Sequence, residues 1–345
     1  MSTRSAGVAI AVLVLSHSLT IATQTPLVAG LNNFIVAWNM PLFFFVAGWA
    51  MALQPLHTPL ESAKRRALTL LIPYLAWIGV LWVVGFPWSD GGPGVGTWFQ
   101  ILLAPTEMWF LYCLFLATVL FTIVRTVGRR PVPVMAGVVV IALAATATSQ
   151  WLPAGMLTLA NLGWLLPFLA AGFYGCQLSR RSPRMSTLAK AALAVPALVL
   201  VWLAVGADVA HAMFALWPLS LVPGGGAAAS LANHAVRYAL AAAGIATVWY
   251  AVRLAPARAQ KALSSLGIAT LGIYALNSPM LTGMRLAFPA WSVVAGPEFT
   301  VPVALVAASI VLLAEWLITA ALGMNALTRI ALLGRRAKPA ASSGT

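Results

Sequence analysis

The chain has 345 residues, of which 61% are hydrophobic and 8% are charged, and its formal net charge is +14. Soluble domains carry about 25% charged residues, so this composition excludes a soluble protein and indicates one that lies in a lipid bilayer. The basic residues lie in short gaps beside apolar runs, where topology and anionic lipid headgroups explain them, so nucleic acid is not expected as a partner.

Ten apolar runs approach the length that a membrane helix needs, which is roughly 20 mostly apolar residues. We therefore predict an all-α, polytopic membrane bundle of about ten transmembrane helices, at residues 6–23, 31–53, 67–86, 109–127, 132–149, 157–177, 187–206, 230–252, 264–285 and 299–320. The first run lacks a clear small-x-small cleavage site, so it is expected to remain as a helix. Residues 1–333 are predicted to form one domain, followed by a basic, disordered cytoplasmic tail at 334–345.

The basic residues alternate with the predicted helices. Eighteen of the twenty Lys and Arg residues fall in every second gap, and the gaps between them carry none. Short loops rich in Lys and Arg stay on the cytoplasmic side of a membrane. With an even number of helices, this pattern places both termini in the cytoplasm. The remaining two, Arg237 and Arg285, fall within or at the end of a predicted helix.

Four polar side chains lie at a similar depth in four of the predicted helices. His17, Asn39, Arg237 and Asn277 are each six to eight residues from the outer end of their helix. At 1.5 Å per residue, all four lie about 10 Å below the outer surface. Polar groups within a membrane are costly and therefore indicate a function or a partner. If the four helix faces converge, these side chains form a polar pocket that opens to the outside.

Each polar residue also has a purely structural explanation. A lone His or Asn in a membrane helix is often a hydrogen-bonded packing residue. Arg237 requires an anion, which Glu107 or Asp208 at the outer rim, or a ligand, would supply. Glu315 is expected to pair with an Arg of an inner loop, and His57, in a basic inner loop, is expected to be solvated.

The residue inventory limits the possible chemistry. Four scattered histidines and the lack of paired carboxylates predict no metal site, and Cys113 and Cys176 lie within apolar runs as packing residues. A single imidazole in a membrane pocket can act as a general base near neutral pH, with amide or cationic groups stabilising an oxyanion. Acyl transfer to a hydroxyl group suits this inventory.

Several stretches carry a family resemblance: residues 7–10, 15–18, 38–48, 70–74, 108–112 and 271–277. The most specific of them contains Met-Pro-Leu-Phe-Phe-Phe at 40–45. In order and spacing they resemble the acyltransferase-3 superfamily, and most closely its fucose 4-O-acetylase-like branch. The resemblance covers most of the chain.

The resemblance implies a ten-helix membrane O-acyltransferase, and in this branch an O-acetyltransferase. The donor would be acyl-CoA from the cytoplasm, and the acceptor a hydroxyl of a glycan or lipid-linked molecule in the plasma (inner) membrane of a bacterium. No cofactor is expected to stay bound. His17 would be catalytic, and the residues supporting its pocket would be Asn39, Arg237, Asn277 and Trp109. The donor would bind at Lys64, Arg65 and Arg66, although charge placement alone explains this cluster equally well by topology.

The chain departs from the family pattern at several positions. The family usually has a basic residue eleven positions before the first-helix His, where this chain has Ala6, and two other family imidazoles are replaced by Asn39 and Asn277. An amide forms hydrogen bonds but cannot shuttle a proton. Two alternatives therefore stay open: a transporter or flippase of a lipid-linked or anionic small molecule, and a catalytically inert relative.

Overall fold

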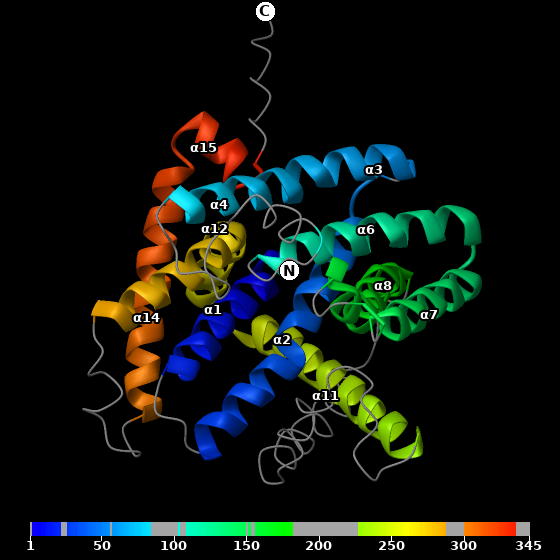
Figure 1. Cartoon of the computed structure of the whole chain (residues 1–345), viewed down its shortest axis with the longest axis horizontal. Helices are drawn as coiled ribbons and strands as arrows, with labels where there is room; N and C mark the ends of the chain where they lie inside the picture. The colour runs from blue at the N-terminus through cyan, green and yellow to red at the C-terminus, as the bar shows by residue number, and fades with distance from the viewer. Residues whose placement is uncertain are drawn as a thin grey trace, which may run out of the picture.

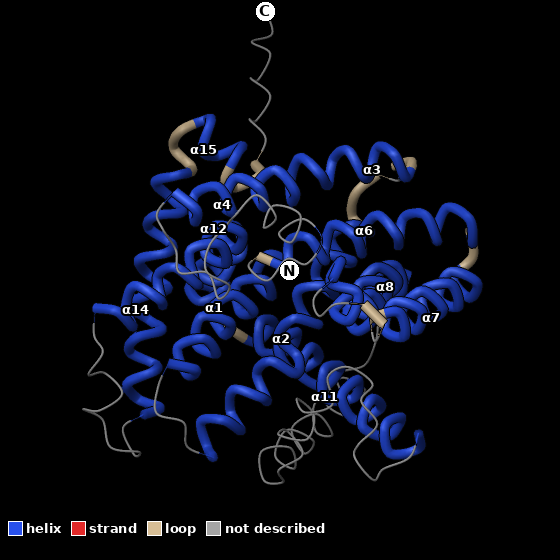
Figure 2. Tube along the Cα trace, in the orientation of Figure 1, coloured by secondary structure: helices blue, strands red, loops and turns tan. Residues whose placement is uncertain are grey.

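The architecture of the chain was obtained as a computed structural model. The structure describes residues 2–21, 26–55, 57–83, 103, 108–149, 151–152, 156–181, 227–287 and 300–335. All secondary structure within these residues is helical, and no strand occurs among them (Figure 2). The prediction of an all-α fold class is confirmed.

The helices follow the predicted apolar runs closely. In chain order they are α1 (Ser2–Ile21), α2 (Pro26–Ala52), α3 (Pro59–Arg66), the π-helical η1 (Ala67–Leu71), α4 (Ile72–Val83), α6 (Trp109–Gly128), α7 (Pro131–Thr148), the 3-10 turn η2 (Met156–Thr158), α8 (Leu159–Arg181), α11 (Ala227–Leu254), α12 (Ala257–Ala287), α14 (Thr300–Leu322) and α15 (Ala326–Ala331). The predicted run at 187–206 lies outside the described residues, and each of the others overlaps one of these helices.

Within the described part of the chain, seven helical segments are long and apolar enough to cross a membrane. They are Thr3–Thr20, Gly30–Ala52, Pro59–Val83, Trp109–Gly128, Pro131–Thr148, Met156–Arg180 and Val301–Leu322. α11 and α12 are not among the seven, although they contain 28 and 31 residues. Helices of this length and composition indicate a membrane protein. The count of ten and the cytoplasmic position of both termini stay predictions.

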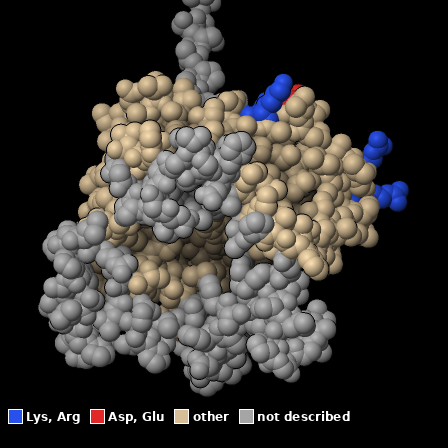
Figure 3. Space-filling view, viewed as in Figure 1, with Lys and Arg blue, Asp and Glu red and all other residues tan. Residues whose placement is uncertain are grey.

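The outward faces of α7 and α14 are apolar. Val140 and Leu143 on α7, and Val306 and Ile310 on α14, are all more than half exposed. Contiguous exposed apolar surface is unusual in a protein surrounded by water, and it is expected in one surrounded by lipid. On the face shown in Figure 3, the visible Lys and Arg atoms lie only at the upper and right-hand edges. The rest of the described part of this face is free of visible charge.

Helix α1 lies inside the bundle (Figure 1). It packs against α12, α2 and α14. Helix α8 also packs against α2, and α7 and α6 pack against α8. The contact between α1 and α12 depends on glycine, because a Cβ atom on Gly7 would lie 1.9 Å from the carbonyl oxygen of Leu263. A Cβ atom on Gly267 would lie 1.7 Å from the carbonyl oxygen of Thr3. Such small residues allow membrane helices to approach closely.

We expect Gly267→Ala to destabilise the protein, since the added methyl group cannot fit between α1 and α12. Overpacking of this kind costs about 1–3 kcal/mol. The midpoint of thermal unfolding of the purified protein in detergent should therefore fall by several degrees. Gly283→Ala on the same helix is the matched control, because a Cβ atom there would meet nothing within 4 Å. Equal midpoints for the two variants would show that the close contact does not stabilise the bundle.

The third predicted helix begins earlier than the sequence analysis placed it. α3, η1 and α4 run without a break from Pro59 to Val83, so the predicted start at residue 67 is wrong. Thr58 and Glu61 form a capping box, in which each side chain accepts a hydrogen bond from the backbone N–H of the other residue. The prediction followed hydropathy alone, and α3 is polar. As a consequence, Arg65 and Arg66 lie on a helix and not in a loop.

Candidate functional site

His17 lies on α1, four residues before the end of the helix at Ile21, and its side chain is half-buried. The two flanking serines have different roles. Ser16 donates a hydrogen bond from its hydroxyl to the amide oxygen of Asn32 on α2, at 2.5 Å. Ser18 donates to the carbonyl oxygen of Val14 in its own helix. Ser16 therefore connects α1 to α2 next to His17, whereas the hydrogen bond of the Ser18 hydroxyl stays within its own helix.

Three side chains from three helices form a continuous hydrogen-bonded chain. The Nδ1 atom of His17 is hydrogen-bonded to the Oδ1 atom of Asn277 on α12. The Nδ2 atom of Asn277 donates a hydrogen bond to the Oε1 atom of Glu315 on α14, at 3.0 Å. Asn277 is 1% exposed and Glu315 is fully buried. The chain thus runs from the half-buried imidazole into the centre of the bundle.

The expected partner of Glu315 was an Arg of an inner loop, and that expectation is wrong. Glu315 bonds to Asn277, and no Lys, Arg or His forms a salt bridge with it within the described residues. A carboxylate buried in a membrane without a cation is costly and is usually retained for a function. Glu315 therefore belongs to the candidate site, together with His17 and Asn277.

The orientation of the Asn277 amide relates the tautomer of the imidazole to the carboxyl group of Glu315. Oε1 of Glu315 accepts, whether the carboxyl group is ionised or carries its proton on Oε2, so the NH₂ group of Asn277 faces it. The amide oxygen of Asn277 then faces His17 and can only accept. In this arrangement the neutral imidazole of His17 carries its proton on Nδ1 and keeps its lone pair on Nε2. This tautomer leaves Nε2 available as a general base.

Asn39 lies on α2 and Arg237 lies on α11. Asn39 is buried, and the structure, which describes both residues, shows no hydrogen bond between it and His17. It lies seven residues beyond Asn32 on α2, which is about 10 Å along that helix from the Ser16–Asn32 hydrogen bond. The guanidinium of Arg237 on α11 lies over the ring of Trp164, 4.0 Å from its centroid. Its predicted anions, Glu107 and Asp208, lie outside the described residues.

Trp109 is the first residue of α6 and is half-buried. Its neighbour Phe110 connects α6 to the site, because the Phe110 N–H donates to the hydroxyl oxygen of Tyr274 at 3.4 Å. The two rings are also 5.3 Å apart between centroids. Tyr274 lies on α12 one turn before Asn277. The start of α6 is therefore held against the helix that supplies the amide of the site.

The basic cluster predicted to bind the donor lies on α3, and only part of it faces a pocket. Arg65 and Arg66 line a pocket between α3 and the helices α2, α6 and α8, whereas Lys64 is exposed outside it. His57 and Arg125 line the same pocket. The sequence analysis placed His57 in solvent, but its side chain is 19% exposed and its Nε2 atom is buried.

Some of these residues were detectable from sequence and some were not. The Thr58–Glu61 capping box follows a known sequence pattern and would have extended α3 to include Arg65. The proximity of Glu315 to Asn277, and of Arg125 to α3, results from packing between helices far apart in sequence, for which a single sequence has no local signal.

Comparison with known proteins identifies the family of the chain. The family model of an acyltransferase domain matches residues 7–320. No curated protein and no solved structure matches the chain. The matched region includes α1 with His17, α12 with Asn277 and α14 with Glu315. The chain belongs to the acyltransferase-3 family.

Proposed function

We propose that the chain is a membrane O-acyltransferase, and specifically an O-acetyltransferase. It takes an acyl group from acyl-CoA on the cytoplasmic side and transfers it to a hydroxyl of a glycan or lipid-linked acceptor. The proposal includes ten membrane helices, both termini in the cytoplasm and a location in the plasma membrane of a bacterium. Its main support is the His17–Asn277–Glu315 chain, which lies within an acyltransferase family domain.

In the proposed reaction, His17 is the general base. Its Nε2 atom takes the proton of the acceptor hydroxyl while the hydroxyl oxygen attacks the carbonyl carbon of the thioester. The carbon–sulfur bond then breaks, the thiolate leaves, and the imidazolium returns the proton to the sulfur. Asn277 and Glu315 hold the ring in the tautomer that this step requires.

The remaining predicted residues have supporting roles in the proposal. Asn39 has a buried amide oxygen with no hydrogen-bond partner among the described residues, so it is suited to bind a polar group of the acceptor. Arg237 holds an anionic group, and Trp109 lines the site. Lys64, Arg65 and Arg66 attract the anionic end of acyl-CoA.

The proposal is tested with membranes from cells that carry or lack the gene, incubated with acetyl-CoA labelled in the acetyl group. Label should enter glycans or lipids only when the chain is present. Equal labelling in both membranes would reject an acyltransferase. A transporter needs no thioester, so in that case acetyl-CoA would leave the thermal midpoint of the purified protein unchanged. Comparing surface glycans and lipids between the two cell types identifies the acceptor.

A further inference from the structure

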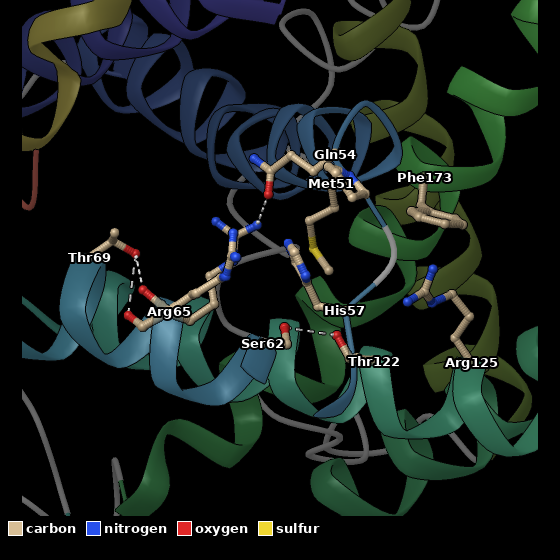
Figure 4. A pocket seen from close by; sticks show the side chains of 11 residues that line it. Met51, Gln54, His57, Ser62, Arg65, Thr69, Thr122, Arg125 and Phe173 are labelled. Atoms are coloured by element: carbon tan, nitrogen blue, oxygen red, sulfur yellow. Dashed lines mark hydrogen bonds between the residues drawn. The ribbon is translucent and has the colours of Figure 1, made fainter. Parts of the chain in front are cut away.

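A pocket of about 270 Å³ lies where the C-terminal end of α2 meets α3, α6 and α8 (Figure 4). It is separate from the His17–Asn277–Glu315 chain and shares no residue with it. Its lining residues are Met51, Gln54, Pro55, His57, Ser62, Arg65, Arg66, Thr69, Thr122, Arg125 and Phe173.

The lining is strongly basic. Arg65, Arg66 and Arg125 line it together with His57, and none of the lining residues that the structure describes is acidic. The nearest described carboxylate is that of Glu61, 3.8 Å from Nδ1 of His57. That side chain is 60% exposed and its oxygen is occupied by the capping hydrogen bond to Thr58. Among the described residues, none that lines the pocket balances its positive charge.

The imidazole of His57 can also bind an anion, whereas the two hydroxyls of the pocket are already engaged. Those of Ser62 and Thr122 are hydrogen-bonded to each other at 3.3 Å across the α3–α6 contact, and Thr122 donates to the carbonyl oxygen of Thr118 at 2.7 Å. Nε2 of His57 is buried without a hydrogen-bond partner among the described residues. A buried unpaired ring nitrogen is costly and is usually satisfied by a ligand or water. Guanidinium groups bind phosphate oxygens through two parallel N–H groups.

Arg125 is positioned opposite the cluster on α3. It lies in the last turn of α6, and its guanidinium lies 5.3 Å from the centroid of the Phe173 ring on α8. Figure 4 shows its side chain directed toward the pocket from the side opposite Arg65. Arg66 is held by a hydrogen bond of 3.4 Å to the amide oxygen of Gln54. An anion in the pocket would therefore be bound from both α3 and α6, and Arg125 would be the cation that α6 provides.

We propose that this pocket binds a phosphate group and that Arg125 is the residue on which this binding depends. The inference rests on the proposed function in one respect, namely that the phosphate is that of the nucleotide end of the acyl-CoA donor. The pocket is smaller than the range of about 300–1,000 Å³ typical of ligand sites, which fits a phosphate-bearing end and not a whole nucleotide. An anionic lipid headgroup presents the same phosphate chemistry, so the two sources must be separated by experiment.

Binding is measured on the full chain purified in detergent, as the shift of its thermal midpoint. Adenosine 3′,5′-bisphosphate should raise the midpoint of the wild type, and pantetheine, which has no phosphate, should not. Arg125→Gln should lose this shift. Arg129→Gln is the matched control, because Arg129 lies one turn later at the end of α6 and is exposed outside the pocket. Stabilisation by phosphatidylglycerol alone would assign the pocket to a lipid headgroup and overturn the donor assignment.

Transfer is measured in membranes with two labelled donors, acetyl-CoA and acetyl-pantetheine. Arg125→Gln should raise the KM for acetyl-CoA about ten-fold or more, the effect of losing a hydrogen bond between charged groups, and leave the use of acetyl-pantetheine unchanged. An equal loss with both donors, or an equal effect of Arg129→Gln, would overturn the assignment of Arg125. Transfer from neither donor, even by the wild type, would remove the proposed reaction, while a midpoint shift with the bisphosphate would still support the phosphate site.

Discussion

Alanine in place of His17 is expected to reduce the transfer of label from acetyl-CoA by about 10²–10⁴-fold, the usual contribution of a general base. The expectation follows from the position of the ring. Its Nδ1 atom is hydrogen-bonded to Asn277, so Nε2 is the nitrogen left to take a proton from an acceptor. No other imidazole with a described side chain lies on a helix of this site. The measurement is the initial rate of acetyl transfer in membranes that contain equal amounts of each variant.

Two further variants separate catalysis from folding. His17→Gln retains an amide that can hydrogen-bond Asn277 but has no basic nitrogen, so it should be as inactive as His17→Ala. Ser18→Ala removes a neighbouring buried hydroxyl that bonds only within α1, and it should transfer label at the wild-type rate. Activity of His17→Gln close to that of the wild type would show that the side chain contributes a hydrogen bond and not a base.

The sequence predicted the positions of individual helices best, because these depend on each helix alone. Apolar runs located most of the described helices within a few residues, because each helix must itself satisfy its backbone hydrogen bonds and present apolar side chains to lipid. The error at α3 has the same origin. Hydropathy detects lipid contact, and the polar segment Pro59–Arg66 is instead specified by its cap at Thr58.

The candidate site is formed by contacts between side chains of different helices, and these contacts could not be predicted fully from a single sequence. His17 and Asn277 were expected in one pocket from their estimated depths, and the structure joins them by a hydrogen bond. The same reasoning placed Glu315 near the inner surface and Asn39 beside the imidazole. Depth counted along a helix ignores tilt and rotation, both of which are set by packing. Close contacts such as that of Gly267 with Thr3 determine which faces meet.

Glutamine in place of Glu315 is expected to lower kcat strongly while leaving the KM for acetyl-CoA unchanged. A glutamine can present its NH₂ group to Asn277, which then turns its own oxygen toward the glutamine and its NH₂ group toward His17. That NH₂ group donates to Nδ1, so the imidazole proton moves to Nε2 and the base is lost. The loss in kcat should lie between about 10-fold and 10⁴-fold, the upper value being the effect of a wrong tautomer in a Ser-His-Asp triad.

The tautomer itself can be observed, which distinguishes this role of Glu315 from a purely structural one. The chain has four histidines, so ¹⁵N labelling of histidine gives a simple spectrum in which His17 is identified by its loss in His17→Gln. The wild type should show a protonated Nδ1, and Glu315→Gln should show protonation shifted toward Nε2. Glu315→Asp, which can only accept at the same place when ionised, should keep the wild-type tautomer although its side chain is shorter.

Thr319→Val is the matched control for the loss of a buried polar group on α14. Thr319 lies one turn after Glu315, is 1% exposed, and its hydroxyl has no hydrogen-bond partner among the described residues. This variant should leave the spectrum of His17 unchanged. If Glu315→Gln lowered kcat with no change in the His17 tautomer, Glu315 would not act through Asn277, and the hydrogen-bonded chain would be structural. A shift of the tautomer with Glu315→Gln alone would instead assign the carboxylate as the group that positions the base.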